Sequence, residues 1–236
     1  MRQPFQFKQF SIADDCCAMK LSSDAVLLGA ATDPGQAANI LDIGTGCGIL
    51  ALMLAQKSNA LIDAVETDNC AARQASQNFG QSQWNDRIKI HQASIQQYAE
   101  KCTKKYGCIV CNPPYFQGQL KSSTPAKSNA RHNSILDFAQ LSHCVSRLLP
   151  DTGTFWAIMP VSEKNNFLKA FMHLGLYCFK NIFISDKPDR ETKRLISCFS
   201  FNVPENVSEQ TLILKNHDNS PSADFIALTK DFYLEF

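Results

Sequence analysis

The sequence predicts an α/β fold in which helices cover both faces of a mostly parallel β-sheet. Short apolar runs alternate with stretches of helical periodicity from about residue 39 onward. The connections between these segments are short, which is typical of parallel strands joined by crossover helices. The last two apolar runs follow each other without a helical stretch between them, so we expect these two to pair antiparallel.

The elements follow in a regular order along the chain. Five apolar runs are expected to form strands: residues 39–43, 61–66, 87–93, 106–111 and 153–160. Helical patterns cover residues 48–57, 69–79, a polar stretch to about Lys101, 135–149 and 162–175. Pro150 and Gly175 end the last two of these helices. The expected antiparallel pair lies at 176–185 and 193–202.

The chain of 236 residues is long enough for one domain with a full core. We expect an N-terminal lid segment at 1–38, a core at 39–203, and a C-terminal extension at 204–236 with a strand, a turn and a short helix. A formal net charge of +1 means that any nucleic-acid surface must be a local patch. Without a signal sequence or a membrane-spanning run, a cytoplasmic protein is expected.

The sequence contains ten cysteines, a number that could indicate disulfides or a metal site. No secretion signal accompanies them, and several lie within apolar runs, where cysteine acts as a small hydrophobe. Cys108 and Cys111 have C-x-x-C spacing, but they lie in an expected strand without a second pair at zinc-ribbon spacing. We therefore expect buried, reduced thiols and no metal; a metal or redox role is the alternative.

A glycine-rich stretch, "ILDIGTGCGIL" at 40–50, follows the first strand of the core and opens a helix. Gly44, Gly46 and Gly48 permit a tight turn and close approach of a ligand, and the helix start presents free amide donors. The spacing is G-x-G-x-G rather than the dinucleotide G-x-G-x-x-G. Asp42, just before the turn, favours a ligand that carries a cationic amino group over one with a pyrophosphate.

The next two strand ends extend this site. Glu66 ends the second strand, where an acid can accept two hydrogen bonds from a ribose diol. A ribose and an ammonium together indicate S-adenosylmethionine as the cofactor. Ser94 and Ile95 follow the third strand and are expected at the adenine, unless Ser94 only caps the next helix. A nicotinamide dinucleotide, or a glycine turn with solvated acids, is the alternative.

The fourth strand ends in N-P-P-Y at 112–115, where two prolines stop the strand. Ligands in doubly wound sheets lie beyond the carboxyl ends of the strands, so Asn112 is expected to face the reactive end of the ligand. The Asn112 side-chain oxygen and the Pro113 carbonyl can accept hydrogen bonds from the two N–H groups of a planar amine, which gains positive charge during methyl transfer. Tyr115 offers a flat face for a stacked base. The alternative is a proline turn with a satisfied asparagine.

The motifs "DIGTGCG", "AVETD" and "NPPY" together resemble the class I S-adenosylmethionine-dependent amino-group methyltransferases. The resemblance spans about residues 39–160 and implies a Rossmann-like, seven-stranded sheet with an antiparallel last strand. Members of this class modify adenine N6, guanine N2 or a glutamine side-chain amide.

A narrower resemblance begins upstream, in "FKQFSIADDCCAMKLSSDAVLLGA" at 7–30. It is similar to the start of the bacterial tRNA(Val) adenine-N6 methyltransferases, which modify adenine 37 beside the anticodon. "KRLISCFSF" and "DFYLEF" resemble the end of that family. The family tends to carry an acid at the position of Ser94 and threonine at that of Ser23. The resemblance implies a tRNA anticodon loop as partner.

Charged residues outside the core motifs complete the expected site. Lys20 and Asp24 precede the first strand of the core, and the segment that carries them can cover the cofactor. Lys20 would meet the carboxylate of the cofactor, and Asp24 would orient the segment. A solvated charge pair is the alternative for both residues. Cations expected to meet tRNA phosphates lie at Lys121, Lys127, Arg131, Lys187, Arg190, Lys193 and Arg194. Solvated surface charge is the alternative for each of them.

Four other functions stay open on the sequence alone. Guanine-N2 transfer and glutamine methylation of a release factor would use the same N-P-P-Y motif. The release-factor alternative would normally come with a helical N-terminal substrate domain, and the roughly 38 residues ahead of the core are too few for one. A non-catalytic cofactor- or RNA-binding module and a nicotinamide dehydrogenase are the remaining alternatives.

Overall fold

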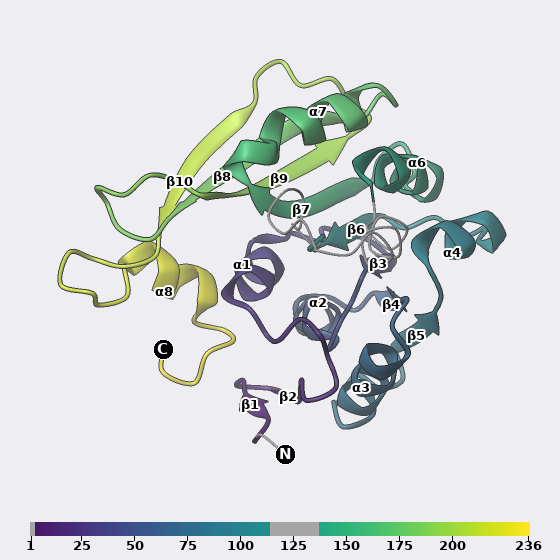
Figure 1. Ribbon diagram of the computed structural model, residues 1–236, viewed down its shortest axis with the longest axis horizontal. Helices are drawn as coiled ribbons and strands as arrows, with labels where there is room; N and C mark the ends of the chain where they lie inside the picture. The colour runs from purple at the N-terminus through teal and green to yellow at the C-terminus, as the bar shows by residue number, and fades with distance from the viewer. Residues whose placement is uncertain (1–2, 114–136) are drawn as a thin grey trace, which may run out of the picture.

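The computed structural model describes residues 3–113 and 137–236 and contains an eight-stranded sheet (Figure 1). The strand order is β10-β8-β9-β7-β6-β3-β4-β5. These strands are β3 (Asn39–Ile43), β4 (Leu61–Glu66), β5 (Ile88–Gln92), β6 (Cys108–Cys111), β7 (Thr154–Pro160), β8 (Tyr177–Ser185), β9 (Arg194–Ser200) and β10 (Ser208–Ile213). All neighbours pair parallel except β9, which is antiparallel to both β7 and β8. The predicted mostly parallel sheet with an antiparallel closing pair is confirmed.

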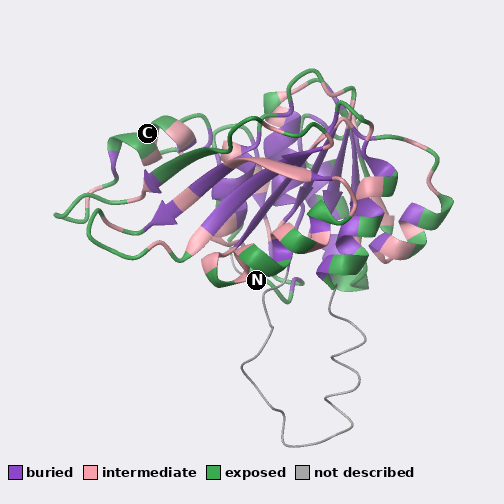
Figure 2. Cartoon of the chain, turned by 90° about the horizontal axis from the view of Figure 1, so that it is seen from above, coloured by how far each residue is buried: buried purple, intermediate pink, exposed green. Residues whose placement is uncertain are grey.

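Helices cover both faces of the sheet, as expected. One core cluster joins it to α1 (Ser23–Ala31), α2 (Ile49–Lys57), α3 (Asn69–Gly80) and α8 (Ala223–Thr229). The other joins it to α4 (Ile95–Lys101), α6 (Phe138–Leu148) and α7 (Lys164–Met172). Successive side chains of a strand point to opposite faces, so Ile40 belongs to the first cluster and Leu41 to the second. The central strands are accordingly buried on both faces (Figure 2).

The C-terminal extension packs against the rest of the chain. Its strand β10 pairs in parallel with β8 and adds an eighth strand to the seven that the resemblance implies. The helix α8 contacts α1, and Phe232 behind it is 2% exposed. The backbone amide of Lys8, between the short strands β1 (Phe5–Gln6) and β2 (Ser11–Ile12), donates to the Phe232 carbonyl at 2.8 Å. The two ends of the chain therefore lie side by side.

All ten cysteines are free thiols, and six of them are buried. Burial raises the pKa of Cys108 to about 12 and that of Cys144 to about 11, so both stay protonated at neutral pH. The expected reduced core thiols are confirmed. None of the helices in the described part of the chain is long and apolar enough to cross a membrane.

Candidate active site

The sheet register brings the predicted strand-end residues to one edge. Ile43 pairs with Val65 on one side and with Cys111 on the other, so Gly44 follows β3 at the level where Glu66 ends β4 and Asn112 follows β6. The order of strands reverses between β3 and β6, because β4 and β5 lie on one side of β3 and β6 and β7 on the other. Such a switch point is where doubly wound sheets bind ligands.

A cavity of about 480 Å³ lies at this edge, within the size range of small-molecule sites. Five segments contribute most of its walls: the N-terminal segment, the glycine loop, and the ends of β4, β5 and β6. The predicted residues that line it are Lys20, Gly44, Gly46, Glu66, Ser94, Ile95, Asn112 and Pro113. The structure therefore brings predicted residues from five separate stretches of the sequence into one cavity.

The glycine loop has the backbone that its residues predict. Gly44, Gly46 and Gly48 all have positive φ, at 70°, 57° and 91°. Gly48 is the N-cap of α2, and a Cβ there would lie 2.4 Å from Cε1 of Phe79. The loop amides of Gly44 and Thr45 donate to the Val65 carbonyl, which ties the loop to the end of β4.

Gly48→Ala is expected to lower the free energy of unfolding by about 2–4 kcal/mol, because a side chain at positive φ and an overpacked contact each cost about 1–3 kcal/mol. Gly80→Ala is the matched control, since Gly80 ends a neighbouring helix and a Cβ there meets nothing within 4 Å. Urea unfolding measures both variants. Equal effects of the two substitutions would contradict this explanation of Gly48.

Asp42 lies beneath the glycine loop, fully buried, rather than on the cavity surface. Its Oδ2 accepts hydrogen bonds from the Thr45 hydroxyl at 2.5 Å and the Ala51 amide at 3.1 Å. Its Oδ1 has no hydrogen-bond partner among the described residues. Burial raises the pKa of Asp42 to about 7, against the opposing hydrogen bonds. Asp42 therefore shapes the glycine loop from below, and the structure does not bring it to the cavity surface where a ligand contact was expected.

The raised pKa of Asp42 predicts a pH-dependent stability. The folded protein binds the proton more tightly than the unfolded chain, whose carboxyl has its ordinary pKa near 3.8. Stability is therefore highest below that pKa and falls as pH rises from about 4 to about 7. Relative to wild type, Asp42→Asn should gain on the order of 3 kcal/mol across this interval. Urea unfolding at several pH values measures this, and parallel profiles would contradict it.

Glu66 is held in place by the backbone around it. Its Oε2 accepts from the Gly46 amide and its Oε1 from the Asp68 amide, both at 2.9 Å. Each carboxylate oxygen keeps a further lone pair for a ligand hydroxyl. The carboxylate thus closes the glycine loop against β4 and faces the cavity at the same time.

Ser94 caps the next helix, which was the alternative expectation for it. Its hydroxyl accepts from the Gln97 amide at 3.2 Å, and the Gln97 side chain accepts in return from the Ser94 amide. Both Ser94 and the buried Ile95 also line the cavity. The cap and a ligand contact are therefore compatible roles.

Residues 13–22, here called the N-terminal wall, contribute their second half, residues 17–22, to the lining of the cavity. Within it the Asp14 carboxylate accepts from the Leu21 amide at 2.8 Å. The Lys20 ammonium donates to the carbonyls of Asp14 and Asp15 at 2.8 and 3.0 Å. An ammonium has three donors, and among the described residues the third one of Lys20 has no hydrogen-bond acceptor. Residues 17–22 of the wall all line the cavity, which places Lys20 as predicted.

Asp24 lies outside the cavity that the N-terminal wall helps to line. Its Oδ1 is 2.6 Å from Nη1 of Arg194, whose Nη2 is 2.6 Å from Oδ1 of Asp186. The structure therefore does not bring Asp24 to the proposed cofactor, and it joins Asp24 to a residue that we expected at the RNA. This ion pair connects the start of α1 with β9.

At the end of β6, Asn112 and the buried Pro113 line the cavity beside the start of the glycine loop, because β6 pairs with β3. Tyr115, Lys121, Lys127 and Arg131 lie outside the described residues, so their predicted roles stay predictions. The sequence analysis missed other lining residues, such as Cys17, Cys47, Thr67 and Gln140. Gln140 comes from α6 and is reached only through tertiary packing, which no local pattern signals.

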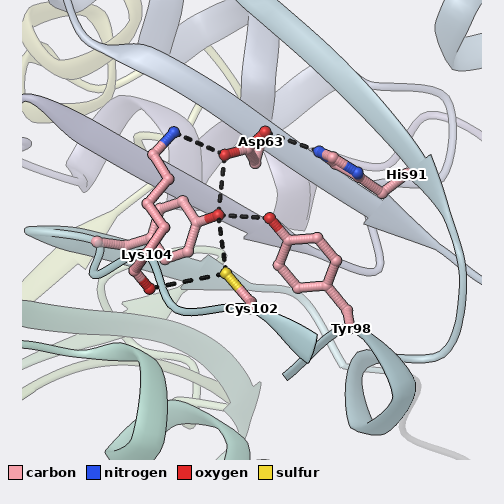
Figure 3. A network of polar contacts seen from close by, with 6 residues as sticks. Asp63, His91, Tyr98, Cys102 and Lys104 are labelled. Carbon is pink, nitrogen blue, oxygen red and sulfur yellow. Dashed lines mark hydrogen bonds and ion pairs between the residues drawn. The ribbon is translucent and has the colours of Figure 1, made fainter. Parts of the chain in front are cut away.

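A second polar cluster lies between β4, β5 and the segment before β6 (Figure 3). Asp63 accepts from Lys104 and Tyr106 at 2.8 Å and lies 2.7 Å from Nε2 of His91. Burial alone would raise the pKa of Asp63, but these hydrogen bonds lower it below its ordinary value. Within residues 3–113 and 137–236, no three His, Cys, Asp or Glu side chains gather as metal ligands would. We interpret this cluster as a tie between β4, β5 and β6.

The fold and the cavity are those expected of a class I S-adenosylmethionine-dependent methyltransferase. A family model described as a methyltransferase small domain matches residues 19–131. A predicted O-methyltransferase from Agrobacterium tumefaciens has a similar structure, with a TM-score of 0.69 and 16% identity over 88% of this chain and 96% of that one. A glycopeptide N-methyltransferase complexed with S-adenosylmethionine has a TM-score of 0.56 and 11% identity, over 76% and 93% of the two chains.

Curated relatives match nearly the whole chain. A tRNA1(Val) (adenine(37)-N6)-methyltransferase of Trichodesmium erythraeum is 42% identical, over 98% of both chains. Proteins of the same name are 43% identical in Phocaeicola vulgatus, over 98% of this chain and 97% of the relative, and 37% identical in Escherichia fergusonii, over 99% and 96%. The chain belongs to the family of tRNA1(Val) (adenine(37)-N6)-methyltransferases.

Proposed function

We infer that this protein transfers a methyl group from S-adenosylmethionine to the N6 amino group of adenine 37 in the anticodon loop of tRNA1(Val). The observation that carries this inference is the position of Asn112 and Pro113 in the cavity, at the end of the strand that pairs with the one leading into the glycine loop. The nearly full-length similarity to enzymes of that name selects adenine among the planar amino groups that such a corner can hold.

The residues of the cavity fit the cofactor. We propose that Glu66 binds the ribose hydroxyls, that the glycine loop approaches the amino-acid end, and that the third donor of Lys20 meets the carboxylate. Ile95 would pack on the adenine ring, with Ser94 beside it. When bound, S-adenosylmethionine supplies an electrophilic methyl group on its sulfur.

Asn112 and Pro113 would activate the accepting nitrogen. An exocyclic amine of a base is a poor nucleophile, because its lone pair is conjugated into the ring. The Asn112 side-chain oxygen and the Pro113 carbonyl can accept the two N–H bonds and orient the lone pair toward the methyl group. Both hydrogen bonds strengthen as the nitrogen gains positive charge, so they stabilise the transition state more than the ground state. The surplus proton leaves to water, and Tyr115 is proposed to stack on the base.

The proposed tRNA surface lies at the same edge of the sheet. Strand β8 is parallel to β10 and, through the antiparallel β9, also to β7 and β6. The segment 186–193 between β8 and β9 therefore emerges where β6 ends at Asn112. Arg190 and Lys193 are exposed on it and Lys187 is half-buried. Arg194 is instead held by two carboxylates, so we place it outside the proposed RNA contacts.

Replacing Lys187, Arg190 and Lys193 together by alanine is expected to raise the KM for tRNA about tenfold and leave the KM for S-adenosylmethionine unchanged. Each lost phosphate contact also lowers the steepness with which tRNA affinity falls with salt. Steady-state kinetics at two salt concentrations measure both effects. An unchanged KM for tRNA and an unchanged salt dependence would remove this segment from the RNA surface.

Nucleoside mass spectrometry of purified tRNA1(Val), from cells with and without the gene, tests the proposed function. We expect N6-methyladenosine to disappear with the gene and to return with the wild-type copy. Loss of N2-methylguanosine would instead indicate the guanine alternative, and unchanged tRNA would favour a protein substrate or a non-catalytic binding module. A cytoplasmic location stays a prediction of the sequence.

A further inference from the structure

Asn78 is a buried residue near the C-terminal end of α3, and the motifs of the family resemblance do not include it. Its side chain is 2% exposed and makes three hydrogen bonds. Its Nδ2 donates to the carbonyl of Ala13 at 2.8 Å, and its Oδ1 accepts from the amide of the same residue at 3.2 Å. The second hydrogen of Nδ2 goes to the carbonyl of Cys47 at 2.7 Å.

These partners belong to two different walls of the cavity. Ala13 begins the N-terminal wall, and Cys47 lies inside the glycine loop between Gly46 and Gly48. A single primary amide therefore joins the two walls through their backbones. Only an amide can do this, because the site needs two donors and one acceptor on one short side chain.

The connection continues from Ala13 to the proposed cofactor contact. The next residue, Asp14, holds the wall closed through its carboxylate, which accepts from the Leu21 amide, and its carbonyl accepts from the Lys20 ammonium at 2.8 Å. A shift of Ala13 would therefore move the carbonyl on which Lys20 rests. The neighbour of Asn78, Phe79, supports the glycine loop at Gly48. The last turn of α3 thus sets both walls.

We propose that Asn78 is a positioning residue for the methyl transfer, which fixes the N-terminal wall against the glycine loop and so sets the affinity for S-adenosylmethionine. The proposal rests on the assignment of this cavity to the cofactor. Asn78 does not line the cavity, so it acts through Lys20 and the glycine loop.

Asn181 provides a matched control. It is also an asparagine with 2% exposure, and its side chain also bridges elements, accepting from Ser197 at 2.7 Å and donating to Glu209 at 3.1 Å. It lies in β8, away from the cavity. A merely structural role for Asn78 would make the two alanine variants behave alike.

The test measures the Kd of S-adenosylmethionine by calorimetry and steady-state kinetics with tRNA1(Val), for Asn78→Ala, Asn78→Asp and Asn181→Ala. Asn78→Asp keeps the shape of the side chain, but it replaces the Nδ2 group, which donates two hydrogen bonds, by an oxygen that faces the carbonyls of Ala13 and Cys47. For both Asn78 variants we expect the Kd and the KM for the cofactor to rise tenfold or more, since two or three buried hydrogen bonds are lost. The kcat at saturating cofactor should stay within about threefold and the KM for tRNA unchanged. Asn181→Ala should lower Tm without changing the Kd.

Hydrogen exchange adds a readout that does not depend on activity. Backbone amides of residues 13–21 should exchange faster in Asn78→Ala, and in Asn181→Ala they should match wild type. A folded Asn78→Ala or Asn78→Asp protein with a Kd within twofold of wild type would overturn the proposal. Glu66→Ala separates this failure from a wrong cavity: if its Kd also stays unchanged, the cofactor assignment fails, and if it rises, only the role of Asn78 fails.

Discussion

Asn112→Ala is expected to lower kcat for methyl transfer by about 10²–10³-fold, while the affinity for S-adenosylmethionine stays within a fewfold of wild type. Removing one preorganised hydrogen-bond partner of a charge that develops in the transition state typically has an effect of about this size. The large effect on kcat with a small effect on cofactor binding would identify an interaction made mainly in the transition state. Single-turnover kinetics with tRNA1(Val) and calorimetry with the cofactor measure the two quantities.

Asn39→Ala is the matched control for Asn112. Both asparagines are half-buried at the ends of neighbouring strands, but Asn39 begins β3 and so lies at the opposite edge of the sheet. We expect the Asn39 variant to keep full activity. Full activity in Asn112→Ala as well would contradict the mechanism, because only the Pro113 carbonyl would then be left to accept a hydrogen bond from the amine.

Glu66→Ala is expected to weaken S-adenosylmethionine binding by about 10–100-fold. Hydrogen bonds to charged groups contribute about 1.5–3 kcal/mol, and the substitution removes those proposed to the ribose. The substitution also removes the hydrogen bond that the Gly46 amide donates to Oε2 of Glu66 in the wild-type protein, at 2.9 Å, and thereby loosens the glycine loop. Calorimetric titration of the folded variant with S-adenosylmethionine measures the change.

Two further variants sharpen the Glu66 prediction. Glu66→Gln keeps one acceptor oxygen without the charge, so its affinity should lie between those of wild type and Glu66→Ala. Glu100→Ala, an exposed acid on α4 that does not line the cavity, should bind like wild type. An affinity of Glu66→Ala equal to that of Glu100→Ala would count against the ribose assignment.

The sequence predicted those parts of the site that depend on local patterns. Apolar runs predicted the positions of the central strands, because parallel strands of this kind are continuous hydrophobic segments, and the glycines predicted a tight turn, which has positive φ at Gly44, Gly46 and Gly48. Since parallel strands end at one edge, Glu66 and Asn112 had to lie near the glycine loop. These inferences need no knowledge of long-range contacts.

The parts that the sequence did not predict depend on tertiary packing. The pairing of β10 with β8 joins residues far apart in sequence, and nothing local to 208–213 specifies an edge partner. The sequence predicts Asp24 at the cofactor and Arg194 at the RNA, whereas in the structure the two residues form an ion pair. Asn78 resembles any helix asparagine until the structure shows the two backbones that it bridges.

We propose that the site at Asn112 methylates adenine 37, and the position of a transferred label in the tRNA tests this. Purified protein is incubated with isotopically labelled S-adenosylmethionine and either tRNA1(Val) or the same tRNA with guanine at position 37. Mass spectrometry of nuclease fragments then locates the label. We predict one labelled N6-methyladenosine at position 37 of the first tRNA and none in the second. Label on a guanine, at another position, or equally in both tRNAs would contradict the claim.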